Sequence, residues 1–347
     1  MSAGAEPRSA AKAAPRVEFC ADAEARRLLD YLWHRGAAFL GCDLAIMGGA
    51  MRAGELDAEI VATRERTARP FGVNLITMHP ELAELIAVCV RRGVGHIVLA
   101  GGLPNASTVT RIKDAGTKLL CFAPVLAIAK KLVRMGADAI VIEGMEAGGH
   151  IGPVSTSVLA QEILPALREV PVFVAGGIGR GEAIVSYVEM GAAGVQLGTR
   201  FVCAHESIAH PRFKQAFLRA GARDAVPSVQ LDPRFSVIPV RALANDGTHA
   251  FVDCQRDVID RFNRGALTRE DAQLEIEHFW AGALRRAVID GDIERGSLMA
   301  GQSVGLVTRE QSTREILDEL VAEAVAALGA RARIALAEPP PLGEAAK

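Results

Sequence analysis

Seven short apolar runs recur along the first 200 residues of the chain, and helical segments follow most of them. The runs lie at residues 44–47, 73–76, 97–100, 119–123, 139–143, 172–175 and 194–197. Their continuous Val, Ile and Leu character is typical of strands that are buried on both faces. Strands of this kind that alternate with helices predict a parallel sheet covered by helices on both sides. The pattern therefore predicts an α/β fold.

Glycine-rich or polar stretches come directly after several of these runs. They are Gly48-Gly49, Gly101-Gly102, the stretch 143–152, the stretch 176–179 and Gly198-Thr199. The carboxyl ends of parallel strands meet at one edge of a barrel or open sheet, and ligands bind there. In the last two loops, backbone N–H groups could face a single anion, which suits a phosphate group.

The stretch 143–152 reads Glu-Gly-Met-Glu-Ala-Gly-Gly-His-Ile-Gly and directly follows an apolar run. Its glycines allow positive φ angles and a close approach of a flat ligand. His150 is the only side chain in the stretch with an ordinary pKa near neutrality, so it is the candidate acid or base. The alternative is a tight turn with a solvated histidine. Glu143, at a strand end, is a candidate cofactor contact, and a paired acid–base role with Glu146 is less favoured because His150 fits that task.

Charge and cysteine content narrow the class of partner. The 39 basic and 41 acidic residues leave a formal net charge of -2. Such a balance gives no overall field toward nucleic acid or an anionic membrane, which favours a small-molecule partner. The six cysteines are scattered without a CxxC pair, and no apolar stretch approaches the length of a membrane span. We therefore expect a cytoplasmic protein with reduced thiols.

The chain divides into five expected regions. We predict a disordered tail at 1–22, an α/β barrel at 23–204 and a helical cap without obvious strands at 205–285. A segment at 286–330 returns to the barrel, and a second disordered tail follows at 331–347. Within the cap we expect helices at 212–220, 253–263 and 269–287.

Six motifs, in this order, resemble the flavin-dependent nitronate monooxygenase family, formerly called 2-nitropropane dioxygenases. They are equally similar to its sister group, the flavin-dependent enoyl-acyl carrier protein reductases. The motifs are Pro70-Phe71-Gly72-Val73-Asn74-Leu75, the stretch 143–152, Ala175-Gly176-Gly177-Ile178, the stretch 196–201, the stretch 206–211 and Met299-Ala300-Gly301-Gln302. The resemblance covers residues 41 to 330 approximately. It implies a (β/α)8 barrel that binds FMN at the strand ends.

The resemblance also implies a set of site residues. His150 would face the substrate over the flavin as the catalytic group, and Met299 and Gln302 would lie in a loop on the substrate side of the flavin. No metal ion is implied: the spacing of His205, Glu206 and His210 favours a structural role at a helix start. The cofactor-binding residues would be Met51, Asn74, Glu143, Gly149, Gly176, Gly177, Gln196, Gly198 and Thr199.

The sequence departs from this family near its amino terminus. A closed barrel needs eight strands, and only seven runs are present. The family has two strand–helix starts before the segment that resembles residues 70–75, but the run at 44–47 lies too close to that segment to leave room for both. We therefore predict a barrel that lacks one βα unit. Either the remaining strands close the gap, or the N-terminal helix covers it, or the chain is compromised by its unpaired strand edges.

Three functions stay open at this stage. The first is FMN-dependent oxidation of alkyl nitronates or nitroalkanes to a carbonyl compound and nitrite, with molecular oxygen as the electron acceptor. The second is FMN-dependent reduction of an enoyl thioester by NAD(P)H. The third is an inactive flavin-binding remnant left by the loss of the βα unit. A requirement for NAD(P)H separates the first two, and a homodimer is possible in each case.

Overall fold

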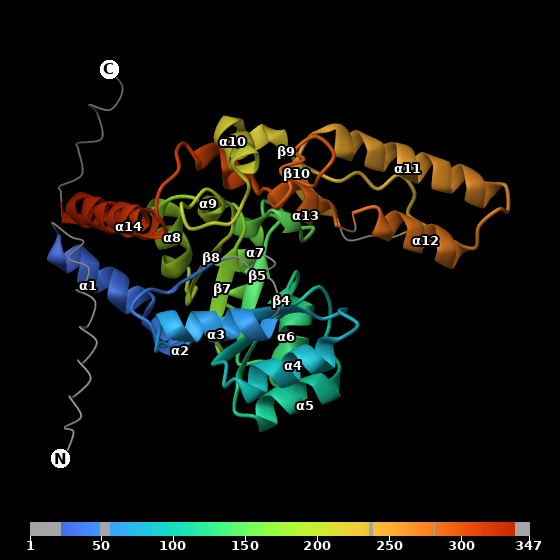
Figure 1. Cartoon of the computed structure of the whole chain (residues 1–347). Helices are drawn as coiled ribbons and strands as arrows, with labels where there is room; N and C mark the ends of the chain where they lie inside the picture. Colours follow the sequence, from blue (N-terminus) through green and yellow to red (C-terminus); the bar gives the residue numbers. More distant parts are fainter. Residues whose placement is uncertain (1–21, 49–55, 236–238, 281, 337–347) are drawn as a thin grey trace, which may run out of the picture.

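The computed structural model describes residues 22–48, 56–235, 239–280 and 282–336. Its main feature is a curled, seven-stranded parallel sheet with helices around it (Figure 1). The strands are β1 (Ile46–Gly48), β2 (Gly72–Ile76), β3 (His96–Ala100), β4 (Lys118–Ala123), β5 (Ala139–Glu143), β7 (Val172–Ala175) and β8 (Gly194–Leu197). Each of the seven predicted strands is confirmed, and the fold is a barrel of the TIM type that lacks one strand.

Helices connect successive strands of this sheet and cover its outer face. They are α3 (Leu56–Arg66), α4 (Leu82–Arg91), α5 (Ala106–Asp114), α6 (Leu126–Met135), α7 (Thr156–Ile163) and α8 (Gly181–Glu189). Alternate strand residues such as Ile140 and Ile142 pack against these helices in the largest hydrophobic cluster. Val141, which lies between these two residues, and Phe173, its partner on β7, belong to a separate cluster inside the barrel. Both faces of the strands are buried, which explains why the runs are apolar without alternation.

The barrel is open between β1 and β2. The strand order is β1-β8-β7-β5-β4-β3-β2, and within the described residues β1 pairs only with β8 and β2 only with β3. The missing βα unit therefore belongs between β1 and β2. β2 shows the consequence, because only Leu75 of its five residues is buried, whereas all four residues of β7 are buried. The remaining strands do not close the gap.

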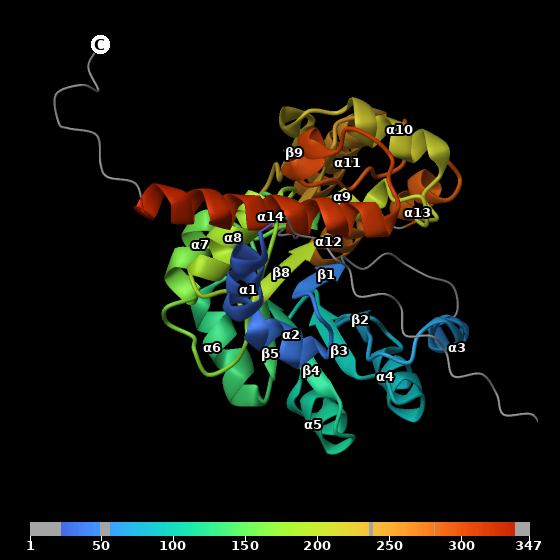
Figure 2. The ribbon, with the colours of Figure 1, turned by 90° about the vertical axis from the view of Figure 1, so that its left-hand side faces the viewer.

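Two N-terminal helices pack elsewhere on the barrel. The N-terminal helical segment is divided into α1 (Ala23–Leu32) and α2 (His34–Leu40) at the buried residue Trp33. α1 packs against α14 and α8 (Figure 2). Phe39 of α2 contacts the rings of His96 and Phe173, and its carbonyl oxygen accepts a hydrogen bond from His96 Nε2 at 2.9 Å. α2 therefore helps to close the amino-terminal end of the barrel.

The expected helical cap contains a small antiparallel sheet that the sequence analysis missed. β10 (Val240–Leu243) lies between β9 (Ala225–Pro227) and β6 (Gly149–His150). These strands are too short to show a periodic pattern, and all four residues of β10 are buried. The cap helices are α10 (Pro211–Arg219), α11 (Asp246–Asn263), α12 (Arg269–His278) and α13 (Ala283–Val288), with the 3-10 helix η1 (Ala222–Asp224) before β9.

The prediction of one long helix at 269–287 was wrong, because α12 and α13 are separate helices. Gly282, just before α13, has a φ of 72°, which a continuous α-helix does not allow. α11 and α12 form an arm that projects from the barrel (Figure 1). Its core contains five aromatic side chains, which are Phe235, Phe251, Phe262, Phe279 and Trp280.

The C-terminal part returns to the barrel. It contains the 3-10 helix η2 (Gln302–Leu306) and the helix α14 (Thr313–Leu336), which packs across α8 (Figure 2). The prediction that a disordered tail starts at residue 331 was wrong, because α14 continues to Leu336. Residues 331–336 are mostly Ala, Arg and Leu, which are strong helix formers. Residues 1–21 and 337–347, where we expected disorder, lie outside the described residues, and the regional boundaries stay predictions. Of the helices described, none has the length and apolar character needed to cross a membrane.

Candidate active site

A row of paired residues carries polar side chains on the inner face of the barrel. Glu143 on β5 pairs with Ala175 on β7, Ala175 pairs with Gln196 on β8, and Gln196 pairs with Met47 on β1. Paired residues of a parallel sheet point to the same face, and Ala175 belongs to the cluster inside the barrel. Glu143 and Gln196 therefore point inward at the carboxyl ends of their strands.

Asn74 on β2 lies on the same inner face. It pairs with Val98 on β3, and Val98 pairs with Leu120 on β4. Leu120 and Val98 both belong to the cluster inside the barrel, which fixes the direction of Asn74. Three of the predicted cofactor-binding side chains, from strands far apart in the sequence, thus face one interior.

Glu143 is a carboxyl group without a charged partner. Within the described part of the chain it makes no ion pair, and no hydrogen bond to its carboxyl group is found. Burial in this apolar interior raises the pKa of Glu143 to about 8. At neutral pH the group is therefore mostly protonated and presents an O–H donor to the site.

His150 lies at the end of the glycine-rich loop, in the short strand β6. Val240 of β10 pairs with His150, and the N–H of Ile151 donates to Pro239 O at 3.0 Å. The residue is exposed, yet partial desolvation lowers the pKa of its imidazole. A neutral imidazole, which can accept a proton, is therefore the main form at neutral pH.

Glu146 in the same loop has a structural partner. Its Oε2 accepts a hydrogen bond from the Thr156 N–H at 2.8 Å and another from Thr156 Oγ1 at 2.6 Å. The carboxylate thus caps the first turn of α7, where an anion is favoured. This role supports the view that Glu146 does not work as an acid–base pair with Glu143.

The segment that contains Met299 and Gln302 packs directly on the glycine-rich loop. The Gln302 N–H donates to Glu146 O at 2.9 Å, and the Gly301 N–H donates to Thr199 Oγ1 at 2.9 Å. Met299 Sδ lies 3.5 Å from the position that a Cβ of Gly149 would take. Five of the predicted site residues, Gly149, His150, Thr199, Met299 and Gln302, therefore belong to one set of packed loops.

The two loops predicted to bind phosphate differ in the space that they leave for an anion. Gly176 and Gly177 have φ angles of 100° and 73°, which only glycine adopts readily. Gly198, at the end of β8, has an ordinary φ of -110°, and a Cβ placed there would meet no atom within 4 Å. The strand end at Gly198 is thus accessible, whereas the 146–147 segment packs on the other loop: a Cβ at Gly176 would lie 3.1 Å from Ala147 N, and one at Gly177 would lie 3.0 Å from Glu146 Cβ. Met51, the remaining predicted contact, lies outside the described residues.

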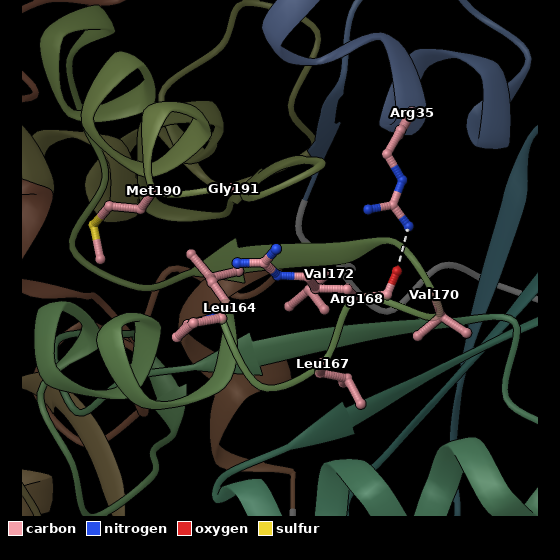
Figure 3. A pocket seen from close by; sticks show the side chains of 9 residues that line it. Arg35, Leu164, Leu167, Arg168, Val170, Val172, Met190 and Gly191 are labelled. Carbon is pink, nitrogen blue, oxygen red and sulfur yellow. Dashed lines mark hydrogen bonds between the residues drawn. The ribbon is translucent and has the colours of Figure 1, made fainter.

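The histidines near α10 and a cavity near Arg35 do not belong to the site described above. Within the described ranges, no group of three His, Cys, Asp or Glu side chains could hold a metal ion. His210 instead begins α10, where its Nδ1 accepts the Arg212 N–H at 3.1 Å. A cavity of about 180 Å³ near Arg35 and Arg168 lies where β7 begins, at the opposite end of the strands from Glu143 (Figure 3).

Arg241 is a buried residue of this region that the sequence analysis did not single out. Its Nε donates to Met145 O at 2.9 Å, and its Nη1 donates to Ala225 O. The sequence did contain an indication of this residue, because Arg241 is the one charged residue in the apolar run 240–243. A charged residue in such a run is uncommon in a buried strand unless it is paired.

The fold and the site together define a class of protein. A barrel of parallel strands with inward polar groups at their carboxyl ends, and a glycine-rich loop with a histidine after one of these strands, is an α/β-barrel enzyme arrangement. The nitronate monooxygenase family model matches residues 84–323, and the chain belongs to this family. The protein is therefore an oxidoreductase, and the cofactor of the family is a flavin.

Known proteins resemble the chain over most of its length. A (3aS,4S,5R,7aS)-5-hydroxy-7a-methyl-1-oxo-octahydro-1H-indene-4-carboxyl-CoA dehydrogenase of Mycobacterium tuberculosis is 28% identical over 311 residues, which cover 81% of this chain and 86% of the relative. A probable nitronate monooxygenase of Bacillus subtilis is 28% identical over 229 residues, or 64% of this chain and 61% of the relative.

Two solved structures share the fold. FabK from Thermotoga maritima superposes with a TM-score of 0.72 and 32% identity, and the match covers 87% of this chain and 91% of FabK. Nitroalkane oxidase from Streptomyces ansochromogenes gives a TM-score of 0.64 and 26% identity, with 86% and 93% covered. These similarities support an oxidoreductase of this family and leave its substrate open.

Proposed function

We propose that the protein is an FMN-dependent oxidoreductase that converts alkyl nitronates or nitroalkanes to a carbonyl compound and nitrite with molecular oxygen. The observation that carries the proposal is that His150, largely neutral, lies in the glycine-rich loop that follows Glu143, a member of the inward row of polar side chains. A base of lowered pKa at this position suits removal of the acidic α-proton of a nitroalkane.

The residues present fit FMN. The phosphate would bind to the backbone of Gly176, Gly177 and Gly198 and to the hydroxyl of Thr199. Asn74, Glu143 and Gln196 would contact the ring system and sugar from inside the barrel, and Gly149 and Met299 would border the ring from the cap side. When bound, FMN would supply electron transfer from the substrate to oxygen.

The chain's own groups provide position and proton transfer. An imidazole nitrogen of His150 would accept the α-proton, or orient a nitronate that is already formed. Desolvation keeps His150 in its basic form at neutral pH, so turnover should persist at neutral pH and fall only as the pH drops through its lowered pKa. The neutral carboxyl group of Glu143 would donate its O–H to an acceptor on the cofactor.

A second candidate function is NAD(P)H-dependent reduction of an enoyl thioester. The match to the Mycobacterium tuberculosis CoA dehydrogenase covers 81% of the chain, against 64% for the Bacillus subtilis nitronate monooxygenase, and supports the thioester class of substrate because the name of that relative specifies a carboxyl-CoA. In this reaction His150 would orient or protonate the substrate. A neutral imidazole donates a proton less readily than a protonated one. Nitronate oxidation is therefore the preferred function.

Two parallel assays test the proposal on FMN-loaded protein. One follows oxygen uptake and nitrite release from a series of alkyl nitronates without NAD(P)H. The other follows NAD(P)H oxidation with enoyl-CoA substrates under nitrogen. Nitrite release without NAD(P)H is the expected result, whereas turnover in the second assay alone would establish the thioester reaction. FMN-loaded protein that is silent in both assays would identify an inactive flavin-binding remnant.

A further inference from the structure

Arg241 is almost completely buried between the cap and the barrel. Its exposed fraction is 3%, and burial lowers the pKa of its guanidinium group. It forms no ion pair with any carboxylate in the described part of the chain. The negative charge of Glu146 favours the charged form of Arg241 and partly offsets the effect of burial on its pKa. A buried cation without a direct carboxylate partner is costly, so its contacts show what it contributes.

The contacts of Arg241 fix the glycine-rich loop at both ends. Its Nε donates to the carbonyl oxygen of Met145, near the start of the loop, at 2.9 Å. Its backbone pairs with Gly149, the residue directly before His150. Its Nη1 donates to Ala225 O on β9, on the other side of β10. One residue therefore ties the loop that carries His150 to the sheet of the cap.

The loop between these two points has little other side-chain support. Gly148 and Gly149 have no side chains, and Glu146 is directed toward Thr156. The remaining anchors are backbone hydrogen bonds: the Met145 N–H donates to Val154 O, the Ala147 N–H to Gly144 O, the Gln302 N–H to Glu146 O and the Ile151 N–H to Pro239 O. If Arg241 were lost, Met145 O and Ala225 O would lose these donors, and a buried acceptor without a partner is strongly disfavoured.

We propose that Arg241 is a positioning residue that holds the glycine-rich loop, and through it His150, in place against the sheet of the cap. Its effect on turnover rests on the proposed function. Its effect on the protonation of His150 does not, because that property belongs to the protein alone.

Desolvation, and not a neighbouring charge, sets the protonation of His150. The charged groups on the elements that pack against it are Arg241 on β10 and Glu146 in its own loop. Arg241 is directed to backbone carbonyl oxygens, and Glu146 caps α7. The lowered pKa of His150 follows from desolvation and not from either of these two charges. A loosened loop should therefore hydrate the imidazole and raise its pKa toward the ordinary value of about 6.5.

The test is an NMR titration of the His150 imidazole in the full-length protein, with the signal assigned from a His150→Asn variant. The pKa of His150 should rise toward its ordinary value in Arg241→Met and rise less in Arg241→Lys, which keeps the charge and one donor. In the same variants kcat should fall more than KM rises, by about 10-fold or more in Arg241→Met, because loss of position costs rate.

Lys214→Met is the matched control. Lys214 is also a buried cation of the cap region, 6% exposed, and its Nζ donates to Ala204 O at 2.6 Å. Its loss should lower stability and leave the pKa of His150 unchanged. A folded Arg241→Met protein with the wild-type pKa at His150 would overturn the proposal. If Arg241→Met does not fold, an unchanged pKa in Arg241→Lys would overturn it instead. The titration is informative even if wild-type protein turns over no nitronate.

Discussion

Gly148 offers the sharpest test of how the site is assembled, because no side chain fits at its position. A Cβ placed there would lie 2.4 Å from Gly301 N and 2.6 Å from the carbonyl carbon of Ala300. Both are backbone atoms, so neither can rotate away. Ordinary contact begins near 3.4 Å, so Gly148→Ala must separate the two loops by about 1 Å, the difference between 3.4 and 2.4 Å.

This separation acts on the hydrogen bonds that join the loops. The Gln302 N–H to Glu146 O bond and the Gly301 N–H to Thr199 Oγ1 bond are both 2.9 Å long and would lengthen. Overpacking of this kind costs about 1–3 kcal/mol of unfolding free energy. A displacement of about 1 Å at an active site can reduce turnover about 100-fold. We therefore expect Gly148→Ala to show both effects.

Gly198→Ala is the matched control for this experiment. Its φ of -110° suits any residue, and a Cβ would meet no protein atom within 4 Å. Urea unfolding of the FMN-free variant should stay within about 0.5 kcal/mol of the wild type. The added methyl group should nevertheless weaken FMN binding, measured by flavin fluorescence, because it enters the proposed phosphate space. Wild-type stability and turnover in Gly148→Ala would refute the packing argument, and undiminished FMN affinity in Gly198→Ala would refute the phosphate assignment.

Three further substitutions test separate parts of the site. Glu143→Gln should remove a pH dependence of stability: the folded pKa of about 8 lies above the ordinary value of 4.5, so the wild type loses stability as the pH rises from 4.5 to 8. Urea unfolding across this range checks it, and parallel curves for both proteins would contradict it. His150→Gln should lower turnover by about 10² to 10⁴ and abolish the acid limb of the pH profile while FMN stays bound; an unaltered profile would remove His150 from the mechanism. Thr156→Val should cost about 1 kcal/mol of stability by removing a hydroxyl donor to the Glu146 cap, which thermal unfolding would detect.

The strands were predictable because their physics is local. The central strands are short, mainly apolar runs that are buried on both faces, and such runs remain visible without any knowledge of the fold. The deficit of one strand was predictable for the same reason. The short spacing between the run at 44–47 and residues 70–75 also indicated its position, and strand pairing agrees with this, because β1 lies beside β8, a strand that begins almost 150 residues later in the chain.

The arrangement of the site was predictable only in part. Glycines and polar residues after strands indicated which loops meet, and register placed Asn74, Glu143 and Gln196 on one inner face. The packing of Gly148 against Gly301 depends on backbone contacts across about 150 residues of sequence, which leave no periodic pattern. The cap sheet was missed because β9 and β10 are so short, and with it the contacts of Arg241.

The central claim is that a barrel open between β1 and β2 still binds a flavin. The most direct measurement is the visible absorption spectrum of freshly purified protein, followed by heat release of the chromophore and titration of the stripped protein with FMN. We predict the spectrum of an oxidised flavin, release of FMN and saturable rebinding. A folded, colourless protein that takes up no added FMN would contradict the claim and show that the interior row of Asn74, Glu143 and Gln196 is not a flavin site in this chain.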